Sequence, residues 1–448
     1  MERTTPSNQT RGNYQYDSND YLEEGRSKKQ PSVSESTHLE LLDDAFLQSI
    51  ESGVHISCPL YDNSRSAAYH KFLNNEQLTA SHMHMRTLAN NRETDLWTQL
   101  IRCAEAAGRG DQETASAKLK QIRQHSSPFG DASQRLAHYF ANGLEERLAG
   151  TGMLLSEPIT QNSTTAADIL KAYQLYVTIC PFRKMTNFYG FQWPCFIYRQ
   201  SLRPGGPPKI RITGIELPQP GFRPAERVEE TGRRLKRLAD RMNVPFEYNA
   251  IAQKWETIQY EDLKIDRDRD EVIVVNCMCR FKNLPDDTMA YNSPRDAVLK
   301  LIKRINPDVF LHGVRNGSYN APFFVTRFRE ALFHYSAYFD MLAATAPRED
   351  QERLLFEREM IGRDAINVVA CEGTQRIERP ETYKQWQMRN LRNGFRQIPL
   401  HQSIIKRVKS IKPDYHKDFI VDEDGQWVLL GWKGKIFHAI SAWKPVQD

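Results

Sequence analysis

Apolar residues recur at two different spacings along the chain, and the spacing changes beyond residue 180. Between residues 92 and 180 they recur every three or four positions in successive stretches, which predicts amphipathic helices. Either core packing or contact with a partner protein accounts for such stripes. The candidates for partner contacts on the first two stripes are Leu96, Leu100, Ile101, Leu136, Phe140 and Leu144.

From residue 207 onward, short runs rich in β-branched residues alternate with helical stretches. Strands are expected over 207–217, 245–252, 271–279 and 307–314, and helices over 223–243, 293–306 and 321–342. This alternation predicts a mostly parallel sheet with helices on both faces. The last residues, 418–444, predict strands joined by tight turns at Asp424-Gly425 and Lys433-Gly434, which suggests an antiparallel edge.

The first 91 residues are polar and show little periodicity, so we expect a disordered region there. Residues 38–50 mix bulky apolar and acidic side chains. They form either a short exposed helix or a segment that folds onto a partner. The seven cysteines have no regular spacing, which favours a reducing interior compartment, and no membrane span is expected.

The net charge of +5 permits nucleic-acid contact without demanding it. Two helical stretches, 227–241 and 403–412, present basic faces that are either solvated or suited to follow phosphates. The first also carries Leu235 and Leu238, two further candidates for partner contacts. The candidates for nucleic-acid contacts are Arg227, Arg233, Arg234, Arg237, Lys406 and Arg407.

The sequence offers little for catalysis. It has no glycine-rich phosphate loop, no nucleophile elbow and no zinc-protease motif. Cys277 and Cys279 suit buried thiols better than metal ligands, because no further ligands lie nearby. Glu216 ends an expected strand, where an acidic residue holds a ribose in some nucleotide sites, but it is equally explained as a polar strand end. We therefore expect no catalytic residue, cofactor or metal.

Several long motifs in a fixed order resemble the GRAS family of plant transcriptional regulators, in particular its scarecrow-like branch. They include "LWTQLIRCAEAA", "YGFQWPCFIYRQSLRPGGPPKIRITGIEL", "APFFVTRFREALFHYSAYFDML" and the terminal "ISAWK". The family-motif residues singled out on this basis are Phe328, Arg329, Glu330, Ser441, Ala442 and Trp443.

The resemblance implies an α/β fold: a Rossmann-type, methyltransferase-like doubly wound sheet with an α-helical cap. The implied domains are residues 1–91, disordered, and a GRAS domain over 92–448, with the cap in 92–180 and the core in 181–448. It implies a nuclear regulator that works mainly as a protein-interaction platform, as a homodimer or heterodimer with family members or with other regulators. Direct DNA binding through the basic faces and a degenerate S-adenosylmethionine-dependent methyltransferase are the alternatives.

The resemblance also indicates a missing element. The family has a helix and a strand of the Val-His-Ile-Ile-Asp type before "YGFQWP", whereas here "CPFRKMTN" runs directly into "FYGFQWPC". The element lengths suggest a gap on the order of 20 to 30 residues. We therefore expect the remaining strands either to leave a void beside "KIRITGIEL" or to pair across it, and the free monomer to be poorly stable.

Overall fold

The computed structural model describes residues 96–150, 164–188, 190, 207–266, 271–286, 293–400 and 402–447. The expected disordered region 1–91, the segment 38–50 and most of the "YGFQWPC" motif lie outside these residues. Within them, no helix combines the length and the apolar character needed to cross a membrane.

Helices from two parts of the chain build one layer. One group precedes the first strand, and the other follows the fourth strand. Polar caps set where they begin: Asp111 accepts a hydrogen bond from the Thr114 amide, and Asp131 forms a capping box with Gln134. The helix bounds are α3 Leu96–Gly108, α4 Gln112–His125, α5 Ala132–Leu148, α6 Ala166–Ile179, α10 Phe324–Thr345, α11 Gln351–Phe356 and α12 Arg363–Ala370. Helix α5 packs against α3, α4, α10 and α12, so segments far apart in sequence build one layer.

The larger sheet has six strands in the order β3-β4-β8-β7-β6, with β5 also pairing with β8. Only β3 and β4 are parallel to each other; the other pairs are antiparallel. The strand bounds are β3 Val274–Met278, β4 Val309–Arg315, β5 Phe395–Ile398, β6 Phe419–Asp424, β7 Trp427–Trp432 and β8 Lys435–Pro445. The sheet is therefore mixed.

The terminal strands have the expected turns, and β7 and β8 lie inside the sheet while β6 lies at its edge. Lys433 and Gly434, with φ of 44° and 85°, form the two-residue turn between β7 and β8. Strand β8 then inserts between β4 and β7, and its residues Phe437–Trp443 are all buried. Only β6 ends the sheet on this side. A strand buried on both faces and paired on both edges is a central strand, so within the terminal segment β6 alone lies at the expected antiparallel edge.

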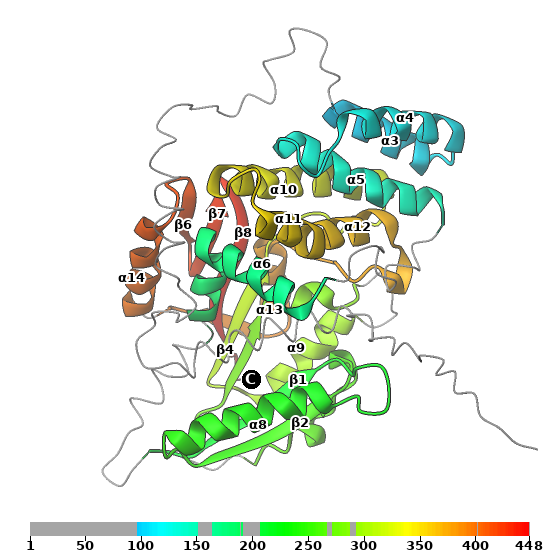
Figure 1. Ribbon diagram of the computed structural model, residues 1–448. Coiled ribbons are helices and arrows are strands. Elements are labelled where there is room, and N and C mark those ends of the chain that lie inside the picture. Colours follow the sequence, from blue (N-terminus) through cyan, green and yellow to red (C-terminus); the bar gives the residue numbers. More distant parts are fainter. Residues whose placement is uncertain are drawn as a thin grey trace, which may run out of the picture. The chain divides into compact units, whose positions relative to one another are not determined.

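A separate two-stranded sheet holds β1 (Ile210–Glu216) and β2 (Phe246–Ala252), which run parallel. Helix α8 (Glu226–Arg241) lies along them, as Figure 1 shows in green. The ring of Tyr248 fills the space beside Gly214 and Gly232, where a β-carbon would come within 2.6 Å of it. These glycines permit the close approach of helix and sheet. Strand β1 does not pair with β3, so the strands have not moved to pair across the expected gap.

The remaining elements connect and cover these sheets. They are the 3-10 turns η1 Trp255–Thr257, η2 Tyr260–Leu263, η3 Phe281–Asn283, η5 Gly373–Gln375 and η6 Lys412–Asp414, the π-helical turn η4 Glu357–Gly362, and the helices α9 Pro294–Ile305, α13 Tyr383–Arg392 and α14 Gln402–Ile411. Helix α9 begins as the sequence predicts, with Ser293 as cap and Pro294 in the first turn.

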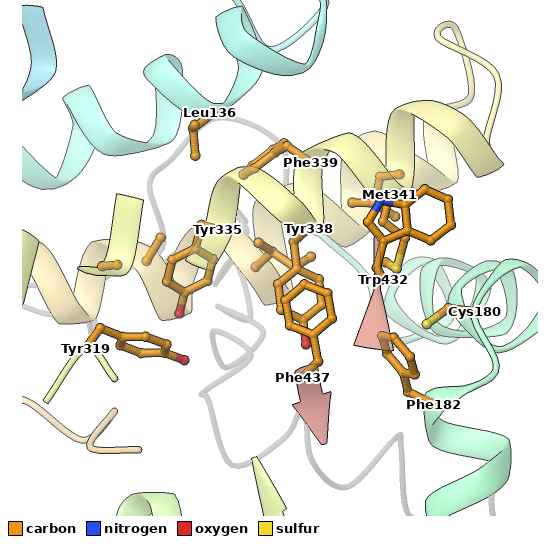
Figure 2. Close-up of a cluster of buried hydrophobic side chains, with 14 of the residues drawn as sticks. Leu136, Cys180, Phe182, Tyr319, Tyr335, Tyr338, Phe339, Met341, Trp432 and Phe437 are labelled. Atoms are coloured by element: carbon orange, nitrogen blue, oxygen red, sulfur yellow. The ribbon is translucent and has the colours of Figure 1, made fainter. Parts of the chain in front are cut away.

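The main core lies between α10 and the strands β7 and β8. Tyr338 of α10 packs on Phe437 of β8 with ring centroids 4.0 Å apart, as Figure 2 shows. The indole N–H of Trp432 on β7 donates to Asp340 at 2.6 Å. All three aromatic rings are almost fully buried, so α10 joins the helical layer to the sheet.

A buried ion triad ties α5 to the segment after α11. The Glu357 carboxylate accepts hydrogen bonds from Arg135 at 3.1 Å and Arg353 at 2.7 Å. All three side chains are at most 3% exposed. Arg135 and Glu357 are 222 positions apart in sequence. A triad of this kind holds its geometry because any one charge left alone would be costly to bury.

The Glu357→Ala variant should be about 3–5 kcal/mol less stable than the unaltered chain, because two buried guanidinium groups lose their only carboxylate in the triad. Chemical denaturation followed by circular dichroism measures this difference. The exposed Glu349→Ala change is the matched control and should alter stability by no more than about 0.5 kcal/mol. A loss below about 1 kcal/mol for Glu357→Ala would contradict a structural role for the triad.

Candidate functional site

The leucine-rich stripes of the helical layer face inward. Leu100, Leu136, Phe140 and Leu144 are between 0 and 3% exposed and belong to the main core. Leu96 and Ile101 are half-buried and pack against the same core. In this structure the apolar stripes pack inside the helical layer and hold it together.

Helix α8 is amphipathic, and most of its basic side chains are paired with carboxylates. Leu235 and Leu238 are half-buried, and Val228 is buried. On the outer side, Glu230 pairs with Arg233 at 2.6 Å and with Arg234 at 3.2 Å. These pairs follow the i,i+3 and i,i+4 spacings that the sequence already contained.

The acidic residues of α8 balance most of the charge of its arginines. Glu226 also pairs with Arg233, Glu230 reaches Arg237 at 3.5 Å, and Arg227 is half-buried. Because the guanidinium groups already face carboxylates, binding a phosphate there would require breaking ion pairs. Exposed pairs of this kind typically contribute little to stability.

The second basic stretch forms α14. Lys406 is exposed there, while Lys409 pairs with Glu423 of β6 at 2.6 Å. The side chain of Arg407 lies outside the described residues. The structure thus places one described candidate of this stretch at the surface.

The family-motif residues divide into buried and exposed members. Phe328 of α10 is fully buried, whereas Arg329 is about half exposed and pairs with Glu105 of α3. Glu330 accepts a hydrogen bond from Ser318 at 2.6 Å.

The second part of the motif lies in the core of β8. Ser441, Ala442 and Trp443 are fully buried there. The Trp443 indole N–H donates to the Ser441 hydroxyl at 2.6 Å, so this motif is internally satisfied. Its role in the structure is to fill the interior of the central strand.

A cluster of polar side chains that the sequence did not reveal lies at the carboxyl ends of β3 and β4. Cys279 follows β3 with a φ of 61°, and its thiol lies 3.4 Å from Nδ1 of His438. Arg315 ends β4 and pairs with Asp364 at 3.4 Å. The carboxyl ends of parallel strands are where α/β proteins place ligands, so these groups are the described candidates for chemistry.

The environment of this cluster keeps its thiols and His438 in their neutral forms. Burial raises the pKa of the Cys277 thiol to about 12 and also raises the pKa of Cys279. Burial, with smaller effects from Arg315, Arg183 and Lys282, lowers the pKa of His438 well below its usual value. A neutral thiol is a poor nucleophile, so the cluster lacks the activated group that covalent catalysis needs.

His334 is a buried histidine of α10. It is fully buried among the rings of Tyr319, Tyr335, Tyr338 and Phe437, with centroid distances between 4.6 and 5.5 Å. Burial also lowers its pKa. Figure 2 shows the tyrosine rings of this group around α10. The histidine serves as an aromatic core residue.

Glu216 at the end of β1 already pairs with another side chain of the protein, so its carboxylate is not open to hold a ribose. Its carboxylate pairs with the Arg280 guanidinium, and its side chain is 15% exposed. Arg280 also lies over the Trp255 ring at 5.9 Å. This favours the reading of Glu216 as a polar strand end.

Comparison with known proteins places this geometry in a family. The model of the GRAS domain family matches residues 96–189 and 188–444, in two segments that meet at residues 188–189. Those segments hold nearly all the described elements.

Curated relatives are similar in sequence to most of this chain. Scarecrow-like protein 14 of Arabidopsis thaliana is 57% identical over 383 aligned positions, which take in 80% of this chain and 50% of the relative. Scarecrow-like protein 9 of the same plant is 54% identical over 376 positions, with 78% and 52% covered. The chain thus spans about half the length of these relatives.

The same alignments contain positions without a counterpart in this chain. The alignment with Scarecrow-like protein 14 has 383 positions but takes in only 80% of the 448 residues of this chain, or about 358 residues. About 25 of its positions therefore have no counterpart in this chain. The corresponding figures for Scarecrow-like protein 9 are about 349 and 376, which leaves about 27.

A solved structure shares the fold. The crystal structure of SCL7 from Oryza sativa superposes with a TM-score of 0.62 at 26% identity, and the match covers 79% of this chain and all of that one. The fold, the ordered motifs and the family model agree, and the chain belongs to the GRAS domain family.

Proposed function

We propose that this protein is a plant nuclear transcription regulator that acts mainly as a protein-interaction platform. Membership of the GRAS family is the observation that carries the proposal. One relative, 29% identical, is named Scarecrow-like transcription factor PAT1. The neutral, buried thiols and His438 near the carboxyl ends of β3 and β4 support a role without catalysis. Its partners would be other regulators, including members of its own family.

The outer face of α10 is the described surface best suited to a partner. Phe323 and Phe333 are 77% and 55% exposed and bracket the helix face that carries Thr326 and Glu330. The Lys435 ammonium lies 4.5 Å from the Phe333 ring centroid. Exposed aromatic rings beside cationic side chains are typical of interface anchors. This face also includes Arg329 of the family motif.

Tethering tests the regulatory role. The full chain, fused to an unrelated DNA-binding domain in plant cells, should change expression from a matching reporter promoter at least several-fold. The Phe323→Asp and Phe333→Asp double variant should lose most of that effect, because two interface anchors become charged. Thr326→Ser on the same face is the matched control and should keep it. A reporter that never responds, although the fusion is folded and nuclear, would contradict the proposal.

DNA contact is proposed to pass mainly through partners, because the arginines of α8 are already paired with carboxylates. The purified full chain should bind a DNA duplex weakly, with an affinity that falls steeply with salt and hardly depends on sequence. Replacing Arg233 and Arg237 with Gln should change that affinity by less than about threefold. Fluorescence anisotropy measures both. Sequence discrimination above about 10³-fold, lost in the Gln variant, would favour direct recognition instead.

A further inference from the structure

Strand β1 has one paired edge and one open edge. The Ile210 amide donates to Pro245 at the start of β2, and the Glu216 carbonyl accepts from Gln253 at its end. Backbone groups alternate between the two edges of a strand. The N–H and C=O groups of Arg211, Thr213 and Ile215 therefore point away from β2, and no described strand pairs with them.

Strand β3 is open in the same way. Its paired edge faces β4. The Cys279 amide donates to the Gly313 carbonyl of β4, and the Ile273 carbonyl accepts from the Val309 amide. By the same alternation, the backbone groups of Val274, Asn276 and Met278 point away from β4. No described strand pairs with this edge either.

Long ion pairs join the two open edges at both ends. At the amino end of β1, Arg211 pairs with Glu271, which precedes β3. At the carboxyl end, Glu216 pairs with Arg280, which follows β3. The strands thus run parallel, with their ends level, and are held together by extended side chains. One inserted strand would place them about 9.5 Å apart, or two strand spacings, a distance that an Arg–Glu pair can span.

Apolar side chains around this region are left in solvent. Ile215 and Leu217 at the end of β1 are 40% and 43% exposed, and Val272 just before β3 is 50% exposed. Exposed aliphatic groups beside unpaired strand edges are a liability for a folded protein. A strand between β1 and β3 would cover both the backbone groups and these side chains.

The chain itself points to the same place. The family match breaks at residues 188–189, and the alignments leave about 25 positions of the relatives unmatched. The Gly190 carbonyl accepts a hydrogen bond from the Asn276 side chain at 3.3 Å. The break in the family match therefore lies beside the side chain of Asn276 in β3.

We propose that the space between β1 and β3 is a binding slot for one parallel β-strand, which this chain receives from another polypeptide. Strands inside parallel sheets are buried on both faces, so the partner segment is a run of about five to seven mainly β-branched and aliphatic residues. The backbone groups of β1 and β3 would bind it by strand addition, and its side chains would select it. This proposal rests on the proposed protein-interaction function and names the kind of segment that would bind. Its test needs no reporter assay.

A synthetic peptide tests the slot directly. It carries seven mainly β-branched and aliphatic residues in one run, flanked by lysines for solubility. At about 100 µM it should bind the full chain and raise its Tm by about 5 °C, measured by anisotropy and thermal unfolding. A scrambled peptide of equal composition should do neither.

Edge variants locate the binding. Ile215→Pro removes an N–H that faces the slot and leaves the β1–β2 ladder intact, so it should weaken peptide binding at least tenfold. Ile215→Val keeps the N–H and should bind as the unaltered chain does. If Ile215→Pro fails to fold, Ile215→Lys, which keeps the N–H but places a charge against an apolar strand, should weaken binding similarly.

Three results would overturn the proposal. The folded chain fails to bind the peptide, or it binds the scrambled peptide equally well, or a second copy of the chain occupies the slot, seen as a dimer that excludes the peptide. A silent reporter together with peptide binding would count against the regulatory function and leave the slot in place.

Discussion

A buried strand must find hydrogen-bond partners for its backbone on both edges, and the architecture follows from where this requirement is met. Strand β8 meets it most fully, with β4 on one edge and β7 and β5 sharing the other. Because β8 is satisfied on both edges, it can be apolar on both faces and carry Trp443 in the interior. Helix α10 then packs on it through Tyr338 and Phe437. The helical layer is anchored to the sheet through that contact.

The requirement is not met between β1 and β3, where the described residues leave two open edges. Long charged side chains, Arg211 with Glu271 and Arg280 with Glu216, join these edges in place of a ladder. Exposed ion pairs contribute little, typically up to about 1 kcal/mol each. This region therefore depends on contacts elsewhere, such as those of η1 and η2 with α9. The absence of a strand in this chain, suggested by the resemblance to the family, stays a prediction that this arrangement agrees with.

Local signals in the sequence predicted local structure well. Ser293 with Pro294, and Lys433 with Gly434, fixed a helix start and a hairpin turn through interactions within a few residues. The ion pairs of α8 were also readable, since Glu230 and Arg234 are four positions apart. Within the described residues, the stretch before residue 180 is helical and the first strand begins at Ile210, as the periodicity predicted.

Long-range features were beyond such signals. The position of β8 depends on pairing with β4, more than 100 residues earlier, and no local pattern states it. The triad of Arg135, Arg353 and Glu357 joins residues up to 222 positions apart, and no motif in the sequence marks it. The polar cluster around Cys279 and His438 joins residues 159 positions apart. These contacts arise from how the layers pack, so only the folded structure reveals them.

The most direct measurement of the split sheet is residue-resolved amide hydrogen exchange on the full chain. The account predicts alternating protection along both strands. Amides that face the ladders, such as those of Ile212 and Gly214 in β1 and Val275 in β3, should exchange slowly. Their neighbours Thr213 and Asn276, which face the slot, should exchange at least tenfold faster. Uniform protection of both sets in the free chain would mean that a strand already fills the space, and would contradict the account.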